Sequence, residues 1–318
     1  MHRKLLAITA GALTGFLLVG AITLLPALAS SRVAPATDGA IVYVDDDTCP
    51  AAGSGTDVDP YCRIQDAVDT VAEGGEVRVA AGTYTGSQMV VDTRTGYTYT
   101  QVVFVDKDLT LRGGYDAADW AADPDPVANP TVIDAQRSGR GVSIVGTVSD
   151  NPLVTLDGFT ITGGDYTGLH NAAEYYYDRG GGLYARRSGL SLLNCTVVDN
   201  IGGRHKHSEG GGIYIQEIYN EVLIENTSVI SNSTPGSSGY GAGIFISGAY
   251  APITITRSVI QDNHASHAFA AIALYSGDAP LTFTETDVRG NRTETHGIVY
   301  LQLSTDTRSS VWTGSDSW

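Results

Sequence analysis

An eleven-residue module recurs five times in the second half of the chain, and it limits the possible folds more than any other feature. The copies align without gaps and begin 36, 32, 31 and 28 residues apart. They read VTLDGFTITGG from Val154, LSLLNCTVVDN from Leu190, VLIENTSVISN from Val222, ITITRSVIQDN from Ile253 and LTFTETDVRGN from Leu281. Positions 1, 3 and 8 are apolar in every copy, which predicts strands with one face directed inward. Four copies end in Asn, which tolerates left-handed backbone, so we expect a turn at that residue.

A second short apolar segment accompanies each module. These segments are GGGLYA from Gly180, GGGIYI from Gly210, GAGIFI from Gly241, AAIAL from Ala270 and GIVYL from Gly297. A repeat of this length cannot bury its apolar face alone, but stacked copies form a continuous core. The β-branched residues and the absence of helical spacing favour stacked parallel strands. We therefore predict an all-β fold, a right-handed single-stranded parallel β-helix.

The N-terminal region predicts a short capping helix. Ile64, Ala67, Val68 and Val71 are spaced as one face of an amphipathic helix, after an Asp-Pro pair at 59–60 and before a Gly-Gly pair at 74–75. Such a helix would cover the open end of the first turn of the solenoid. The segments GEVRVAAGTY and QVVFVDKDLTLRGGY then supply the first strands.

The first 29 residues predict a signal peptide. A basic head precedes an apolar run and an A-x-A cleavage site that ends at Ala29. An uncleaved membrane anchor is the alternative. We expect residues 30–40 to be a linker and 41–318 to be the β-helix domain, with 41–86 as its cap and first strands and 142–318 as the repeat. The last repeat stops without a recognisable cap, so we expect the repeat to be incomplete there.

The cysteines and the net charge limit the compartments and the binding partners that are possible for this chain. Export makes a disulfide between Cys49 and Cys62 plausible, whereas Cys195 is expected to be a buried apolar residue. After residue 29 the chain carries 17 basic and 35 acidic residues, a net charge near −18. That charge argues against nucleic acid or an anionic membrane as a partner. We expect a secreted or cell-surface protein.

The chain resembles a known superfamily. The segments YVDDDTCP, IQDAVDTVAEGGEVRVAAGTYTG, VTLDGFTITGG and the GGGIY units are similar to exported bacterial right-handed β-helix proteins of the pectin-lyase-like superfamily. The resemblance is strongest to surface proteins with a variable C-terminal anchor and to polymorphic outer-membrane protein repeats, and it covers about residues 41–303. It implies the fold. It leaves activity open, because the superfamily includes lyases, hydrolases and adhesins.

The resemblance assigns no catalytic residue. The calcium cluster with an Arg or Lys base of the lyases, and the clustered aspartates with Gly-His-Gly of the hydrolases, are not intact in this sequence. Asp199 and Asp262 lie two turns apart, about 9.6 Å at the spacing of stacked strands. That separation is too long to share one calcium ion and at the outer limit for an inverting glycosidase, so we interpret both as turn residues.

The loops that lead from each module to the next glycine cluster should stack along one edge of the solenoid. Every histidine after the signal segment lies in these loops. The second column of loops, which leads from each glycine-led segment to the next module, has none. We take the candidate ligand-binding residues from this column: His170, Tyr175, Tyr176, Tyr177, Arg179, Arg204, His205, His207, Tyr240, His264, His267 and His296. Tyrosines stack on sugar rings while Arg and His donate to hydroxyls, which favours carbohydrate. Ordinary polar loops are the alternative.

A divalent metal ion, calcium included, is a further alternative for this column, although no cofactor is required. His205, His207 and Glu209 form its tightest group. We therefore expect a non-catalytic carbohydrate-binding or adhesion module whose partner is a polysaccharide or cell-surface glycan. A polysaccharide lyase or glycoside hydrolase and a purely structural stalk are the alternatives. The sequence leaves the oligomeric state open.

Overall fold

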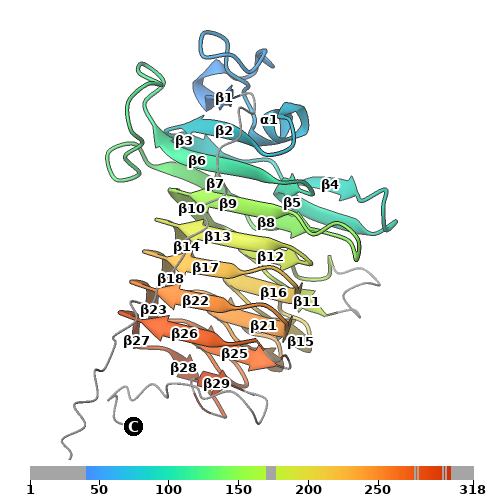
Figure 1. The fold of residues 1–318 in the computed structure, drawn as a ribbon. Helices are drawn as coiled ribbons and strands as arrows, with labels where there is room; N and C mark the ends of the chain where they lie inside the picture. Colours follow the sequence, from blue (N-terminus) through green and yellow to red (C-terminus); the bar gives the residue numbers. More distant parts are fainter. Residues whose placement is uncertain are drawn as a thin grey trace, which may run out of the picture. The chain divides into compact units, whose positions relative to one another are not determined.

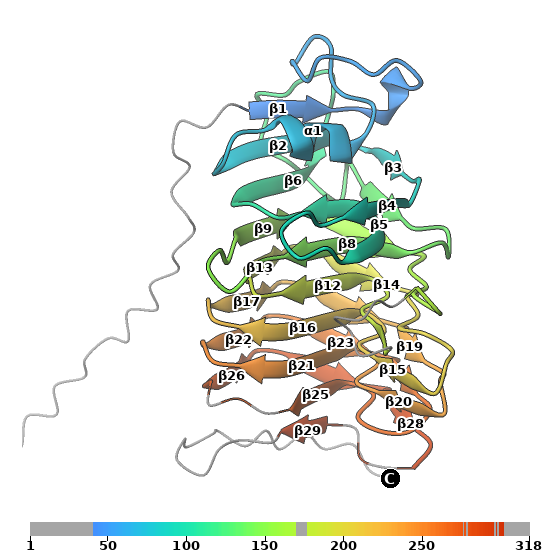
Figure 2. The same ribbon diagram turned by 90° about the vertical axis from the view of Figure 1, so that its right-hand side faces the viewer.

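Strands from successive turns of the chain stack on one another, as Figures 1 and 2 show. The structure is a computed structural model that describes residues 41–169, 177–275, 277, 279–295, 297 and 299–301. All of these residues belong to one compact unit, residues 36–318. The predicted signal peptide and linker, residues 1–40, lie outside the described residues.

The first sheet contains position 1 of every module. Its eight strands pair in the order β1-β2-β6-β9-β13-β17-β22-β26. Their bounds are β1 Ile41–Val44, β2 Gly75–Ala80, β6 Leu109–Tyr115, β9 Leu153–Asp157, β13 Gly189–Leu193, β17 Val222–Glu225, β22 Ile253–Thr256 and β26 Leu281–Thr284. The strands pair in the same register as the gap-free alignment of the modules. The residues at position 1, Val154, Leu190, Val222 and Ile253, lie opposite one another in neighbouring strands. Each of these four is at most 2% exposed.

The second sheet is formed by the later half of each module. Its strands pair in the order β27-β23-β18-β14-β10-β7-β3. Their bounds are β3 Gly82–Tyr84, β7 Thr131–Asp134, β10 Phe159–Thr162, β14 Thr196–Val198, β18 Ser228–Ile230, β23 Val259–Gln261 and β27 Asp287–Arg289. The apolar residue at position 8, such as Ile161 or Val197, points into the same core as position 1.

The third sheet contains the segment that follows each glycine cluster. Its strands pair in the order β29-β25-β21-β16-β12-β8-β5-β4. Their bounds are β4 Gln88–Val91, β5 Thr98–Val105, β8 Arg140–Val145, β12 Leu183–Arg186, β16 Ile213–Ile218, β21 Ile244–Ala249, β25 Ile272–Tyr275 and β29 Val299–Leu301. Among the strands of the described residues, β4 with β5 is the one antiparallel pair. The remaining pairs are parallel, so the fold prediction is confirmed.

Two narrow ribbons stack beside the long sheets. The site ribbon, as we name it, consists of β11 Asp178–Arg179, β15 His207–Glu209 and β20 Ser238–Tyr240. The second ribbon consists of β19 Ser233–Thr234, β24 His264–Ala265 and β28 Arg292–Thr293. Both ribbons come from the loops predicted to stack along one edge, and their pairing places those loops in register.

The Asn that ends four of the five modules is buried, and the turn expected at that residue is wrong. Asn200, Asn232 and Asn263 are 0% exposed. The Asn200 Nδ2 donates to Asn232 Oδ1 at 3.0 Å, and Asn232 Nδ2 donates to Asn263 Oδ1 at 3.0 Å. The backbone N–H of Asn200 also donates to Asn232 Oδ1, at 3.0 Å. The amides therefore form a hydrogen-bonded ladder along the stack, because each has a donor on one side and an acceptor on the other.

The left-handed backbone occurs one residue earlier, at position 10. Asp199 and Ser231 have φ of 56°, and Asp262 has φ of 54°. This conformation confirms the interpretation of Asp199 and Asp262 as turn residues. Position 5 is left-handed as well, at residues such as Asn194 and Asn226 with φ of 51° and 48°. Each module therefore turns twice, once between the first and second sheets and once after the second sheet.

The helix α1, Ile64–Thr70, packs against the first turns of the stack. Ile64, Ala67 and Val68 are buried in the main core, as predicted. The helix begins later than the Asp-Pro pair, because Tyr61 pairs with Val44 as a β-bridge. Gln65 closes part of the edge of β5: its Nε2 donates to the Phe104 carbonyl at 3.1 Å, and its Oε1 accepts from the Phe104 N–H at 2.7 Å. No helix among the described residues is long and apolar enough to span a membrane.

Candidate functional site

The site ribbon places three of the singled-out side chains in one row. Arg179 pairs with Glu209, and Glu209 pairs with Tyr240, across β11, β15 and β20. Each of these residues immediately precedes the glycine cluster that leads into a strand of the third sheet. The row therefore lies where the chain bends from the ribbon back onto the outer face of that sheet.

The glycine clusters make this bend possible. Gly210 has a left-handed backbone with φ of +63°, and a Cβ there would lie 2.8 Å from the Cβ of Tyr214. Two residues on, a Cβ at Gly212 would lie 2.8 Å from Nδ2 of the ladder residue Asn232. Both approaches are too close for a side chain. The glycines of the GGG motif therefore allow a left-handed backbone and leave room for Tyr214 on one side and Asn232 on the other. This lets the ribbon lie close to the sheet.

An aromatic row lies on the outer face of the third sheet beneath the ribbon. Tyr184, Tyr214 and Phe245 occupy equivalent positions in successive strands, and their ring centroids are 5.7 and 5.3 Å apart. The next strand has the small residue Ala273 at this position. Tyr275 continues the stack instead, with its ring 5.2 Å from that of Phe245.

A cleft of about 270 Å³ opens between the ribbon and this aromatic row. It is lined by Arg179, Glu209, Tyr240, Phe245, Ser247 and Tyr275. Sequence reasoning singled out Arg179 and Tyr240, and named Glu209 as a metal ligand, but missed Phe245, Ser247 and Tyr275. A signal for these residues was present, because Phe245 follows the glycine cluster at the same offset as Tyr184 and Tyr214.

The base of the cleft is a shielded ion pair. Arg179 Nε donates to Glu209 Oε2 at 2.8 Å, and the two side chains are only 9% and 13% exposed. The Arg179 guanidinium also lies 4.9 Å from the Tyr177 ring and 5.0 Å from the Tyr214 ring. Burial alone would lower the pKa of Arg179, but Tyr214 and Glu209 outweigh burial and raise it. Arg179 therefore stays protonated.

Tyr240 lies at the rim of the cleft. Burial, and then the nearby charge of Glu209, raise the pKa of Tyr240 above its usual value. Its hydroxyl therefore keeps its proton at neutral pH and can donate a hydrogen bond. The ring contacts His267 edge-on, with centroids 5.0 Å apart.

The remaining histidines of the column form separate contacts. His205 Nδ1 lies 3.2 Å from Oδ2 of the buried Asp178, and His207 stacks on Tyr177 with ring centroids 4.5 Å apart. His264 Nε2 lies 3.9 Å from a carboxylate oxygen of Glu294. Arg204 pairs with Asp165 rather than with the cleft. Of the remaining candidates, His170, Tyr175, Tyr176 and His296 lie outside the described residues.

The structure does not bring the suggested metal ligands together. His205 faces Asp178, His207 stacks on Tyr177, and Glu209 is paired with Arg179. Within the described ranges, no three His, Cys, Asp or Glu side chains are grouped so that they could hold a metal ion. Each of the three side chains has its own neighbouring partner. They are close in sequence, but they do not point toward one common site.

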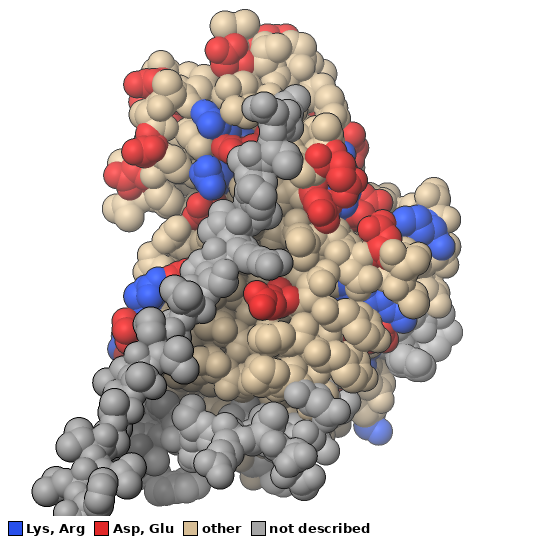
Figure 3. Space-filling view, in the orientation of Figure 1, with Lys and Arg blue, Asp and Glu red and all other residues tan. Residues whose placement is uncertain are grey.

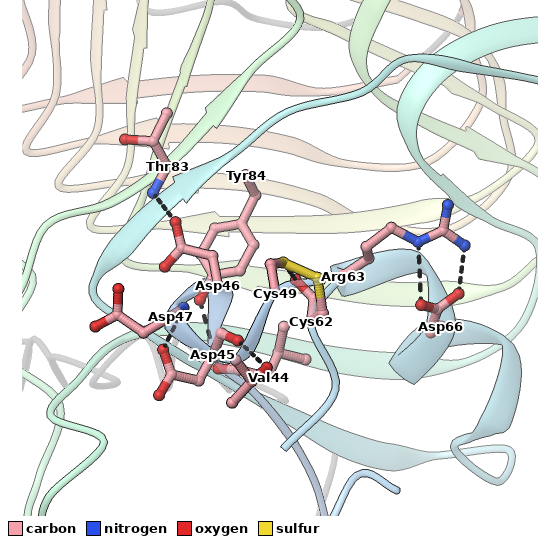
Figure 4. The surroundings of a disulfide bond; sticks show 11 residues. Val44, Asp45, Asp46, Asp47, Cys49, Cys62, Arg63, Asp66, Thr83 and Tyr84 are labelled. Carbon is pink, nitrogen blue, oxygen red and sulfur yellow. Dashed lines mark hydrogen bonds and ion pairs between the residues drawn. A yellow bond between two sulfur atoms is a disulfide. The ribbon is translucent and has the colours of Figure 1, made fainter. Parts of the chain in front are cut away.

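The acidic run near the N-terminus has structural roles, as Figure 4 shows. Asp45 caps the short 3₁₀ helix η1, Asp46–Thr48, by accepting from the Asp47 N–H at 3.1 Å. Asp46 accepts from the Thr83 N–H at 2.8 Å and so ties this loop to β3. Cys49 and Cys62 form a disulfide, with their Cα atoms 5.0 Å apart.

A larger cleft of about 310 Å³ lies between α1 and β4. Its charged lining residues already have partners: Asp92 binds Arg94, and Asp69 accepts from Gln65. Lys107 donates to the Val71 carbonyl at 2.5 Å. The polar groups of this cleft hold the N-terminal turns together, so the smaller cleft, which three aromatic rings line, is the stronger candidate site.

A model of the family described as right-handed β-helix region matches residues 132–309, more than half of the 318-residue chain. That range contains the site ribbon, the aromatic row and the cleft. Comparison with curated proteins and with solved structures gives no significant match.

Proposed function

The chain belongs to the right-handed β-helix family, and on that scaffold we propose that it binds carbohydrate, without catalysing a reaction, in the cleft beside the site ribbon. The observation that carries this proposal is the cleft itself, which Tyr240, Phe245 and Tyr275 line together with the Arg179–Glu209 pair. Aromatic faces pack against the apolar faces of sugar rings, and a few fixed polar groups orient the hydroxyls.

The charge of the cleft suits a ligand rich in hydroxyls. The one cation in its lining, Arg179, is already neutralised by Glu209. The full chain has a formal net charge of −16, and acidic side chains gather over the N-terminal turns on the face drawn in Figure 3. Long-range electrostatics therefore give no attraction for nucleic acid. Tyr240 and Ser247 offer hydroxyl donors and acceptors that do not depend on charge.

The groups in the cleft support binding better than catalysis. A glycosidase uses two carboxyl groups on either side of the scissile bond, and Glu209 is the one carboxylate among the residues that line the cleft. A lyase needs an unprotonated base that takes a proton from the sugar, whereas Tyr214 and Glu209 outweigh burial and raise the pKa of Arg179, so that it stays protonated. A hydrolase or lyase remains the alternative that the experiment below must separate from binding.

We also propose that the protein is exported and meets its glycan outside the cell or on the cell surface. Disulfides persist in oxidising compartments, so the bridge between Cys49 and Cys62 supports this location. The signal peptide proposed at residues 1–29 would direct the export.

A glycan array with the purified full chain tests the proposal. We expect specific binding that Tyr240→Ser and Tyr275→Ser each weaken at least tenfold, since each substitution removes one wall of the cleft. Val127→Ser is the matched control, because Val127 is 93% exposed and lies in the loop between β6 and β7, outside the cleft lining. Binding that is equal in all four proteins, or absent from a well-folded wild type, would overturn the proposal.

Two additions to the array separate the alternatives. Parallel arrays with EDTA should bind equally well, because no described cluster supplies metal ligands. Incubation of the bound glycan with the protein should leave its chain length unchanged. Shorter products that disappear in Glu209→Gln would instead identify an enzyme.

A further inference from the structure

Two exposed tyrosines stack on each other at the far end of the third sheet. The rings of Tyr219 and Tyr250 are 5.2 Å apart and within 13° of parallel. They are 53% and 56% exposed, unlike the buried aromatic row. The two residues follow β16 and β21 in successive turns of the stack. They therefore present a two-ring aromatic surface to solvent.

The backbone directs these side chains outward. Glu217 and Gly248 are register equivalents just before the strand ends, and both have left-handed backbone, with φ of 54° and 69°. The following residues, Ile218 and Ala249, point into the core. A non-glycine residue in this conformation costs about 1 kcal/mol or more, so Glu217 holds the turn at a price in stability.

The tyrosine pair and the cleft lie at opposite ends of the same two strands. The site ribbon precedes β16 and β21, whereas Tyr219 and Tyr250 follow them. Figure 2 shows the ribbon strands β15 and β20 at one edge of the third sheet, with the connections from β16 to β17 and from β21 to β22 at the other. Six residues of strand span about 20 Å at about 3.3 Å per residue. An extended chain of several sugar units would reach from one to the other.

The surface between them is polar. Gln216 and Ser247 are neighbours in the third sheet, directed outward next to the cleft. Arg186 and Arg187 both pair with Glu217, with the Arg186 contact at 3.2 Å. Gln216 Oε1 and Arg186 Nε have no hydrogen-bond partner within the described residues. Both residues are more than nine-tenths buried. An unpaired acceptor and an unpaired donor are thus present at this part of the sheet, and the hydroxyl groups of a ligand offer the partners that both need.

We infer that the ligand is an extended polysaccharide chain that lies across the third sheet, from the cleft at the start of β16 and β21 to the Tyr219–Tyr250 pair at their ends. This inference rests on the proposed function, because it assigns the length and the path of the glycan bound in the cleft. The tyrosine pair is a remote subsite that only long chains reach. It contributes affinity and not specificity for the terminal sugar.

An oligosaccharide length series tests the path. The probes are neutral β-glucan and galactomannan fragments and acidic polygalacturonate fragments, from two to ten sugar units, titrated calorimetrically into the full chain. We expect at least a tenfold gain in affinity for wild type once the fragment spans both sites. The double substitution Tyr219→Ser and Tyr250→Ser should abolish that gain and leave the affinity for short fragments unchanged.

The variants show separately whether the proposed path across the third sheet is wrong and whether the proposed binding in the cleft is wrong. Val148→Ser is the matched control, because Val148 is 77% exposed in a loop between the third and first sheets, two turns earlier than Tyr219. If the tyrosine variant keeps the gain with length, or loses only thermal stability, the pair is structural and the path is wrong. If Tyr240→Ser leaves short-fragment affinity unchanged while the tyrosine variant loses binding, the cleft proposal fails and the remote surface stands. If wild type binds none of the fragments, both are overturned.

Discussion

Asn232→Ala should be among the most destabilising single substitutions in the stack. The Asn232 side chain accepts from the backbone N–H and the Nδ2 of Asn200, both at 3.0 Å. It donates to the Val197 carbonyl at 2.9 Å and to Asn263 Oδ1 at 3.0 Å. Alanine removes all four hydrogen bonds at a position that is 0% exposed.

The cost follows from what the substitution leaves behind. The buried Asn200 N–H loses its acceptor, which costs about 1–3 kcal/mol, and each further hydrogen bond contributes about 0.5–1.5 kcal/mol. Nδ2 of Asn200 keeps its bonds to the carbonyls of Ile161 and Val198, so it adds little to the loss. We expect a total of about 3–5 kcal/mol, a large part of the stability of a typical domain. Because neighbouring turns stabilise one another, the loss should spread to both.

Urea unfolding followed by far-ultraviolet circular dichroism measures this cost. Asn226→Gly is the matched control, because Asn226 is an exposed Asn in the same module with left-handed backbone at φ of 48°. Glycine tolerates that backbone, so we expect the control to stay within about 1 kcal/mol of wild type. A cost for Asn232→Ala that does not exceed the control would refute the structural role of the ladder.

Three further predictions follow from the same structure. Ser231 has φ of 56° on the surface, so Ser231→Gly should stabilise the fold by about 0.5 kcal/mol while Ser231→Val destabilises it by about 1–2 kcal/mol, measured by thermal unfolding. Burial raises the pKa of Cys195 to about 12, so a thiol reagent at pH 8 should label it only after unfolding, and fast labelling of native protein would contradict its burial. Burial raises the pKa of Asp92, but hydrogen bonds from Arg94 and Thr95 outweigh burial and the net pKa is lowered. Its ionised form therefore stabilises the fold above the unfolded carboxyl pKa of about 3.9, and this stabilisation is lost as pH falls through the folded pKa. The difference in unfolding free energy between wild type and Asp92→Asn should therefore shrink below about pH 4. A difference that stays constant down to pH 3 would contradict this coupling.

The repeating parts of the fold could be predicted because their signal is periodic. Residues such as Val154 and Leu190 alternate with polar neighbours, and the stacking of identical turns fixes their register without knowledge of side-chain contacts. The turn expected at Asn200 was wrong because composition does not distinguish an amide that bends the chain from an amide that bonds to the next turn. The left-handed residue proved to be its neighbour, Asp199.

The candidate site was only partly predictable because it depends on loops without periodicity. The stacking of the loops could be foreseen, and it placed Arg179 and Tyr240 on one edge. Phe245 was missed because its surroundings come from residues far apart in the sequence: it is only 4% exposed and packs with Tyr214, Tyr240 and Tyr275. His205 and His207 are neighbours in sequence yet face Asp178 and Tyr177, because side-chain direction is decided by packing and not by spacing.

The most direct test of carbohydrate binding in the cleft is calorimetric titration of the array's tightest oligosaccharide into wild type, Tyr240→Ser and Val127→Ser. We predict that Tyr240→Ser weakens binding at least tenfold while its melting temperature and the affinity of Val127→Ser stay at wild-type values. Equal dissociation constants for all three proteins would contradict the assignment of the cleft.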